Sequence, residues 1–125
     1  MNNLLYTVEN QIATFAINRE PKLNALSAEV LQLFLRGLDE AEADPEVRVV
    51  VVTGSGERAF CTGGDLASGE LGENSPARLY ARLLRRLNGF PKPSIARVNG
   101  YCLAGGMGLM LACDLAIARE DARFG

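Results

Sequence analysis

Two glycine-containing turns hold the residues of this sequence whose types and spacing are best suited to chemistry. Residues 60–66 (Phe-Cys-Thr-Gly-Gly-Asp-Leu) follow the apolar run 49–53, and residues 99–108 follow the strand-like run 94–98. Glycine permits positive φ and lets a ligand atom come close to the main chain. A helix that begins at such a turn directs unpaired N–H groups into the space before it. Two such turns can aim two N–H donors at one oxygen, as in an oxyanion hole.

A strand-to-helix turn can also need glycine only for its backbone conformation. The spacing of these residues does not distinguish that role from an oxyanion hole. Four ordered motifs give the turns a more specific meaning. They are residues 59–66, residues 92–106 (Lys-Pro-Ser-Ile-Ala-Arg-Val-Asn-Gly-Tyr-Cys-Leu-Ala-Gly-Gly), Asn18-Arg19 with Asn24-Ala25-Leu26, and residues 112–118 with 122–125. Together they resemble the enoyl-CoA hydratase/isomerase (crotonase) superfamily over the whole chain. This superfamily carries out several reactions, so the resemblance indicates a family and not one reaction.

The resemblance implies an α/β fold that is crotonase-like, the ClpP/crotonase spiral of β-β-α units. Residues 1–125 are then expected to be the N-terminal portion of a single domain, truncated after the second oxyanion-hole helix. The family continues with elements that build most of its trimer contacts, so we expect a fragment that exposes sheet edge and core surface. A natural short protein stabilised by self-association is the alternative. The full-length form is expected to be a homotrimer or hexamer.

The resemblance also implies an acyl-CoA thioester as substrate, with an enolate that places negative charge on the thioester oxygen. The backbone N–H groups of Gly64 and Gly105 are expected to hold that oxygen. The residues expected beside the CoA portion are Lys22, Leu23, Ala59, Thr62, Asp65 and Leu66. Because CoA is part of the substrate, no separate cofactor and no metal are expected.

Three charged residues in these motifs have competing explanations. Lys22 is suited to pair with CoA phosphates, although a lone surface lysine is commonly just solvated. Asp65 is better explained as a helix cap after the first turn than as a catalytic group. Asp114 lies in the apolar segment 112–118, where it satisfies neighbouring backbone donors or serves as a buried catalytic carboxylate.

The sequence departs from the family at one position that carries chemistry. Hydratases of the family commonly have a glutamate three residues after the second oxyanion glycine, as general acid and base for water, whereas this chain has Gly108. A second family glutamate falls after Gly125. We still expect an enoyl-CoA hydratase/isomerase of fatty acid metabolism. The alternatives are another crotonase-type reaction (dehalogenase, decarboxylase or hydrolase) or a non-catalytic acyl-CoA-binding or assembly fragment.

Composition argues against several classes of protein. A net charge of −2 gives no electrostatic basis for binding nucleic acid or an anionic membrane, and no apolar stretch approaches the roughly 20 residues of a membrane span. The chain start lacks signal-peptide features, and Cys61, Cys102 and Cys113 lack the spacing of a disulfide framework or zinc site. We therefore expect reduced thiols in the cytoplasm. With no histidine, Ser-His-Asp and His-metal chemistry is excluded within this chain.

Apolar periodicity predicts the elements that must position the turns. Residues 4–8 and 12–17 form a predicted hairpin, and residues 47–53 read as a strand buried on both faces. Ser27 is a good N-cap for a helix that runs to about residue 44, before Pro45. The remaining predictions are a polar loop at 70–76, helices at 77–87 and 105–113, and strands at 94–98 and 114–118.

Two of these helices have a predicted apolar face. The first face consists of Val30, Leu31, Phe34, Leu35, Leu38 and Ala41, and the second of Leu79, Leu83, Leu84 and Leu87. The second helix also carries a basic stripe made of Arg78, Arg82, Arg85 and Arg86. A solvated outer face explains this stripe best, with contact to CoA phosphates or a neighbouring subunit as the alternative.

Overall fold

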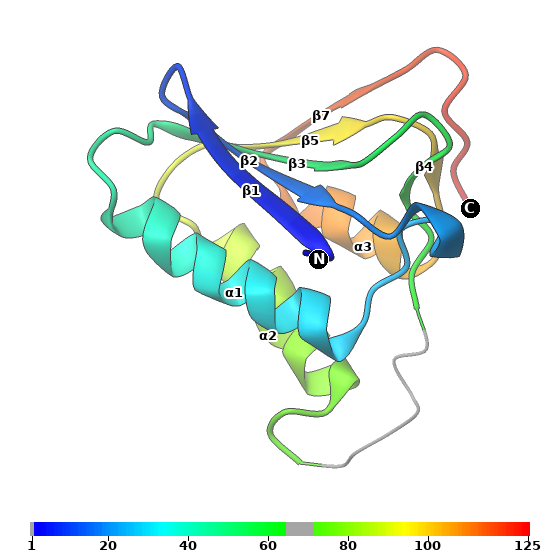
Figure 1. The fold of residues 1–125 in the computed structure, drawn as a ribbon, viewed down its shortest axis with the longest axis horizontal. Coiled ribbons are helices and arrows are strands. Elements are labelled where there is room, and N and C mark those ends of the chain that lie inside the picture. Colours follow the sequence, from blue (N-terminus) through cyan, green and yellow to red (C-terminus); the bar gives the residue numbers. More distant parts are fainter. Residues whose placement is uncertain (1, 65–71) are drawn as a thin grey trace.

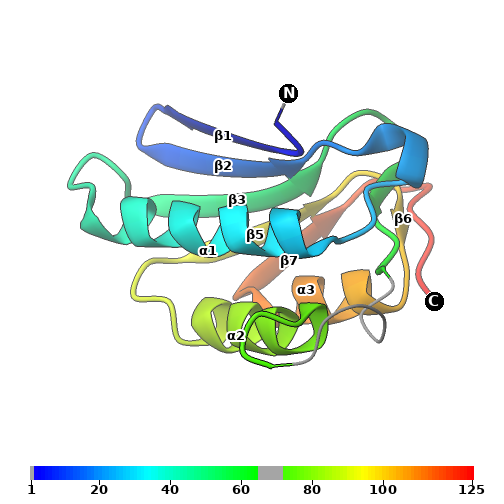
Figure 2. The same ribbon diagram turned by 60° about the horizontal axis from the view of Figure 1, so that its bottom comes forward.

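Helices cover one face of a five-stranded sheet in a computed structural model that describes residues 2–64 and 72–125 (Figure 1). Figure 2, a view from another side, places α1 (Ala28–Ala43), α2 (Pro76–Asn88) and α3 (Gly105–Ala112) on that same face. The helix predicted after the first turn and residues 70–71 of the predicted loop lie outside the described residues. The observed architecture is the predicted α/β fold.

The sheet has the strand order β1-β2-β3-β5-β7. Its strands are β1 (Leu4–Glu9), β2 (Ile12–Ile17), β3 (Val49–Gly54), β5 (Ser94–Val98) and β7 (Leu115–Ala118). The hairpin partners β1 and β2 are antiparallel, whereas β2, β3, β5 and β7 are parallel to one another. Parallel strands end at a common edge, so the segments that follow β3 and β5 are brought together there.

A second, two-stranded parallel sheet lies at this edge and consists of β4 (Ala59–Cys61) and β6 (Tyr101–Cys102) (Figure 1). A short 3-10 helix, η1 (Glu20–Lys22), lies at the same end. These three elements were not predicted from the sequence, because each has only two or three residues. Such short runs carry no readable periodicity.

Local sequence explains where the helices begin. Ser27 accepts a hydrogen bond from Val30 N at 3.2 Å, and Ser75 accepts one from Arg78 N at 3.3 Å, so each caps the helix that follows it. Helix α3 begins differently, after Ala104, and has no side-chain cap. The predicted helix boundaries agree with the observed ones to within one or two residues.

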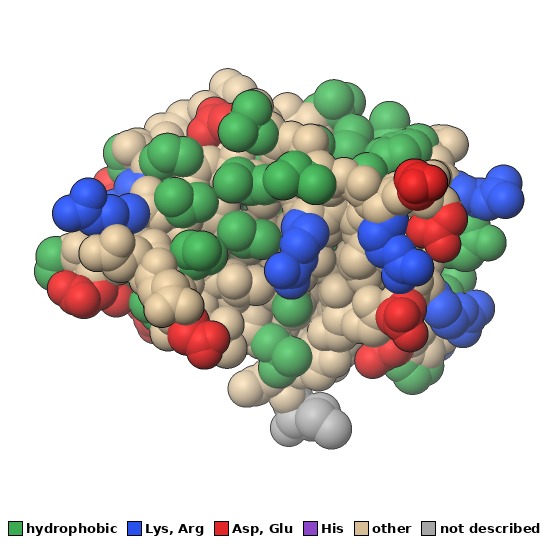
Figure 3. Space-filling model, turned by 90° about the horizontal axis from the view of Figure 1, so that it is seen from above, with side chains coloured by type: hydrophobic (Ala, Val, Ile, Leu, Met, Phe, Trp, Pro, Cys, Tyr) green, Lys and Arg blue, Asp and Glu red, His purple; other side chains and the backbone are tan. Residues whose placement is uncertain are grey.

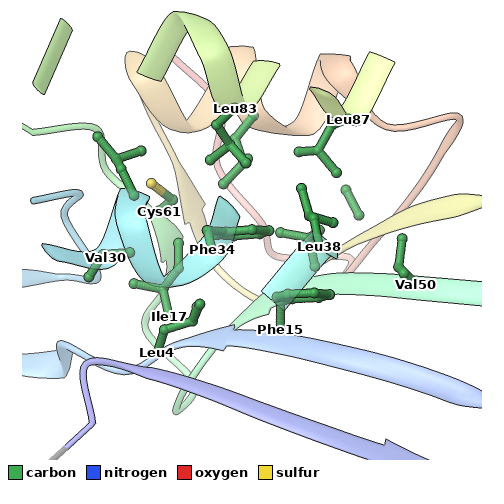
Figure 4. Packing of buried hydrophobic residues seen from close by; sticks show 14 of the residues in the cluster. Leu4, Phe15, Ile17, Val30, Phe34, Leu38, Val50, Cys61, Leu83 and Leu87 are labelled. Atoms are coloured by element: carbon green, nitrogen blue, oxygen red, sulfur yellow. The ribbon is translucent and has the colours of Figure 1, made fainter. Parts of the chain in front are cut away.

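The core lies between the sheet and the helices, and Figure 4 shows part of it. The rings of Phe15 (β2) and Phe34 (α1) stack with centroids 4.8 Å apart and an interplanar angle of 2°. A β-carbon on Gly37 would lie 2.5 Å from Phe15 Cε2, so this helix position needs glycine for close packing. Of the predicted inward residues, Leu35 and Leu84 are only half-buried; the others are buried.

The opposite face of the sheet is uncovered, so the predicted burial of the strand at 47–53 on both faces is wrong. Val49 and Val51 of β3 are half-buried, and Leu115 and Ile117 of β7 are 63% and 64% exposed. Figure 3 shows hydrophobic side chains gathered on this face. An uninterrupted apolar run is typical of a strand covered on both sides, but the described residues supply a covering layer on only one.

Two surface predictions can be compared with the structure. Arg78, Arg82 and Arg85 are exposed as expected, whereas Arg86 pairs with Asp39 at 2.7 Å and also with Glu42 of α1. One member of the basic stripe therefore joins α2 to α1. In the described part of the chain, every helix is too short or too polar to cross a lipid bilayer.

Candidate active site

The two glycine turns meet at the edge where the parallel strands end. A β-carbon placed on Gly63 would lie 3.0 Å from Gly105 N and 3.2 Å from Ala104 Cβ, so the two backbones are in contact. Leu103 N donates to Cys61 O at 3.0 Å, which links the second turn directly to β4. The turns predicted as partners are thus neighbours in space.

The first turn is held by the chain segment that follows β2. Gly63 O accepts a hydrogen bond from Leu26 N at 2.5 Å, and a β-carbon on Gly64 would lie 2.3 Å from Leu26 O. Thr62 Oγ1 donates to Leu23 O at 3.0 Å. The structure therefore brings together Leu23 and Thr62, two residues that the resemblance places beside CoA.

Two asparagine side chains fix the loops around the turns. Asn24, which is fully buried, donates through Nδ2 to Ala59 O at 2.8 Å and to Ser55 O at 3.1 Å. Asn99 donates to the same Ala59 O at 3.1 Å and accepts from Gly54 N at 3.1 Å. Both residues belong to the family motifs, but nothing in the sequence indicates that their side chains donate to the same carbonyl.

The second turn has an unusual backbone at Ala104, which adopts φ 49° and ψ −118°. A non-glycine residue at positive φ is uncommon and is held by its surroundings. Here Ala104 N donates to Gly125 O at 2.8 Å, and a β-carbon on Gly106 would lie 2.0 Å from Cys61 O. Close backbone packing on both sides of the turn keeps this conformation.

The donors expected from the sequence are the backbone N–H groups of Gly64 and Gly105. Among residues 2–64 and 72–125, the structure gives neither group a protein acceptor. Gly105 is the first residue of α3, where a backbone N–H has no partner within the helix. Gly64 is exposed and Gly105 is half-buried.

The thiols near the turns are not activated. Burial raises the pKa of Cys61 to about 12, although a hydrogen bond from the Gly63 backbone acts in the opposite direction. Burial also raises the pKa of Cys102 and of Cys113 to about 11 each. Because a thiolate is the reactive form, these cysteines stay protonated at neutral pH and are poor nucleophiles.

The other residues expected beside CoA lie in different surroundings. Lys22 is exposed on η1, and Leu23 is half-buried in the left-handed region with φ 53°. Ala59 is buried in β4, where its carbonyl accepts the asparagine bonds described above. Asp65 and Leu66 lie outside the described residues.

Positions 108 and 114 bear on acid–base chemistry, because position 108 has glycine in place of the glutamate common in the family and Asp114 is a carboxylate in an apolar segment. Gly108 faces Tyr80 of α2, whose hydroxyl donates to Gly105 O at 2.7 Å. Asp114 is exposed, and its carboxylate accepts from Ser94 N at 2.9 Å while Asp114 N donates to Ser94 Oγ at 3.0 Å. Asp114 thus serves backbone donors at the start of β5, the first of the two roles considered, and it is not buried. Tyr80 carried no signal in the sequence.

The chain is similar to known proteins over nearly its whole length. Residues 7–125 match the family described as Enoyl-CoA hydratase/isomerase. The short-chain-enoyl-CoA hydratase of Clostridium acetobutylicum is 36% identical over 100% of this chain and 49% of its own. The (E)-benzylidenesuccinyl-CoA hydratase of Thauera aromatica is 37% identical over 94% of this chain and 47% of its own.

A solved enoyl-CoA hydratase from Bacillus anthracis has a TM-score of 0.91 and 32% identity, over 99% of this chain and 50% of its own. The fold is therefore of the crotonase type. The chain belongs to the enoyl-CoA hydratase/isomerase family, as its four motifs indicated. It spans about half the length of the curated relatives that it matches.

Proposed function

We propose that this chain supplies the oxyanion hole of an acyl-CoA-transforming enzyme of the hydratase/isomerase type. Gly64 N–H and Gly105 N–H hold the thioester oxygen and stabilise the enolate that forms when charge moves onto it. Fixed donors act strongly on such developing charge because they need no reorganisation during the reaction. The observation that carries the proposal is the contact between the two turns, in which Gly63 lies against Gly105 N.

The CoA portion of the substrate is proposed to lie along the segment from η1 to the first turn. Thr62 and Leu23 are joined by a hydrogen bond of 3.0 Å, so the loop after β2 and the first turn form one surface. Lys22 is exposed next to it and supplies a positive charge for a phosphate. Ala59, Asp65 and Leu66 complete the set that the family resemblance assigns to CoA.

A binding and turnover measurement on the complete natural polypeptide that carries these residues tests the proposal. Acetoacetyl-CoA is expected to bind in isothermal titration calorimetry, and crotonyl-CoA is expected to be hydrated faster than in buffer. If acetoacetyl-CoA binds with no more heat than free CoA does, the acyl group makes no contact of its own, and this result would contradict an oxyanion hole for the thioester. Light scattering on the same sample tests the proposed trimer or hexamer.

A second candidate function follows from position 108, where a glycine provides no carboxyl group for acid–base work. In this alternative the same oxyanion hole serves another crotonase-type reaction (dehalogenation, decarboxylation or hydrolysis) or only binds an acyl-CoA. Incubation with a panel of enoyl-, malonyl-type and halogenated acyl-CoA thioesters separates the candidates by product. Hydration of crotonyl-CoA favours the hydratase/isomerase-type enzyme, whereas binding of an acyl-CoA without any product favours a non-catalytic module.

A further inference from the structure

The space in which a side chain at position 108 would lie is taken by a residue of another helix. A β-carbon placed on Gly108 would lie 2.2 Å from Tyr80 Oη and 3.4 Å from Tyr80 Cζ. Real β-carbons essentially never come within 3.0 Å of another heavy atom outside their own segment, so a side chain here requires the phenol to move. Gly108 and Tyr80 are therefore coupled by packing.

The hydroxyl that occupies this space is also engaged. Tyr80 Oη donates to Gly105 O at 2.7 Å, a short and well-formed hydrogen bond. Gly105 is the first residue of α3, and its N–H is one of the two proposed oxyanion donors. The bond thus ties α2 to the turn that carries the donor. Moving the phenol to admit a side chain at position 108 takes the hydroxyl away from Gly105.

The surroundings keep the phenol in its donor form. Burial raises the pKa of Tyr80 above its ordinary value of 10.0, and the neighbouring Cys61 acts in the same direction. A phenol that is protonated at neutral pH donates its proton to the Gly105 carbonyl throughout the physiological range.

We propose that Tyr80 is a positioning residue of the oxyanion hole, which acts through its hydrogen bond to Gly105 and whose hydroxyl lies in the space that a side chain at position 108 would enter. The assignment rests on the proposed function of Gly105. A glutamate at position 108 would displace this hydroxyl from Gly105. Proton transfer in this enzyme is then left to groups other than residue 108.

Tyr80→Phe tests the assignment in the complete natural polypeptide, because it removes only the hydroxyl. Loss of one neutral hydrogen bond is expected to lower kcat about 3- to 10-fold with KM little changed. The thioester carbonyl band of bound butyryl-CoA reports polarisation in the hole directly. Its shift on binding is expected to be smaller in Tyr80→Phe than in the unaltered protein.

Tyr6→Phe is the matched control. Tyr6 is half-buried in β1 against Phe15, with ring centroids 4.9 Å apart, and its hydroxyl makes no bond recorded between described residues. The same chemical change there is expected to leave kcat and the carbonyl band unchanged. Unaltered kcat and an unaltered band in Tyr80→Phe would overturn the assignment.

Gly108→Ala gives a second approach that keeps Tyr80. The added methyl is expected to push the phenol off Gly105 and to lower kcat by about as much as Tyr80→Phe does. The double variant is expected to show no further loss, because both single changes remove the same bond. Additive losses would contradict the coupling. If the unaltered protein binds no acyl-CoA at all, the proposed function fails, whereas an unchanged band in Tyr80→Phe rejects the Tyr80 assignment alone.

Discussion

The first and second glycine turns reach the same corner of the molecule by different means. The first is held by neighbours from the N-terminal part of the chain, with Leu26 against Gly63 and Gly64, and with the Asn24 amide on Ala59. The second is held by close backbone packing, in which Gly106 lies directly on Cys61 O. Both turns therefore depend on close backbone contact, and they differ in the segment that supplies it: the loop after β2 for the first turn and β4 for the second.

This difference has a consequence for the site. The proposed donor of the second turn, Gly105, begins a helix, and its carbonyl accepts a hydrogen bond from Tyr80 of α2. The proposed donor of the first turn, Gly64, is exposed and lies beside Leu26. The second of these glycines is thus held by a packed helix pair, and the first by the loop after β2. Variants of the two turns should fail in different ways.

The largest effect is expected at Gly106. Gly106→Val places a β-carbon 2.0 Å from a backbone oxygen that has no freedom to move aside, so we expect loss of the folded protein. Gly89→Val is the control, since a β-carbon at Gly89 meets nothing closer than 3.6 Å. Circular dichroism and soluble yield of the complete polypeptide measure both. A folded Gly106→Val protein would show that the second turn does not depend on this contact.

Removal of an oxyanion donor comes next. Gly105→Pro deletes the N–H at the first position of α3. Its ring also lies toward Gly63 and follows Ala104, whose ψ of −118° does not suit a residue before proline, so the turn is expected to suffer as well as the proposed hole. Turnover is expected to fall by about 10²–10³, the usual loss for one oxyanion donor. Gly64→Pro tests the other donor in the same way.

Ala28→Pro is the matched control, because it places proline at the first position of another helix, α1, and leaves both proposed N–H donors in place. It is expected to leave turnover unchanged, and circular dichroism must show that each variant is folded. Normal turnover in folded Gly105→Pro would mean that the thioester oxygen is polarised elsewhere. The glycines would then have only a conformational role.

The asparagine clamps are expected to have an intermediate effect. Asn24→Ala and Asn99→Ala each leave buried backbone groups without a partner, and each should lower the free energy of unfolding by about 1–3 kcal/mol. Because both amides donate to Ala59 O, either single variant leaves this carbonyl one donor and only the double variant leaves it none, so the double variant should lose more than the sum. Urea unfolding of the unaltered protein, the two single variants and the double variant measures these losses. Strict additivity would show that the two clamps act independently.

The smallest effect concerns the thiols of the two turns and appears only at high pH. The pKa of Cys61 is raised from 9.0 to about 12 in the folded protein, so above pH 9 the unfolded chain loses this proton first. Stability is therefore complete below pH 9 and falls as the pH rises toward 12, by about 1 kcal/mol at pH 10 for this buried thiol. Urea unfolding of Cys61→Ala should show a shallower decline.

Alkylation of the native protein compares the two thiols directly. Cys102, whose pKa is about 11, should react with iodoacetamide at a lower pH than Cys61 does. Simultaneous reaction would indicate that both turns open together. Reaction of Cys61 first would show that the clamp on the first turn is the weaker one.

Much of the fold was readable in the sequence because its signals are local. Ser27 caps its helix as predicted, and the two strand-like runs 4–8 and 12–17 pair as the predicted hairpin. The family motifs indicated the two turns from the sequence alone. The burial of residues 47–53 on both faces was predicted wrongly, because an apolar run does not reveal how many layers cover it.

The sequence alone therefore determined the longer helices and strands, the family and the pair of glycines proposed as donors. Only the tertiary structure showed that Gly63 lies against Gly105, that Asn24 and Asn99 share one carbonyl, and that Tyr80 fills the space at Gly108. These contacts join residues that are 28 or more positions apart in the chain. Helix caps and strand alternation depend on neighbours within a few residues, whereas these contacts depend on how the elements pack.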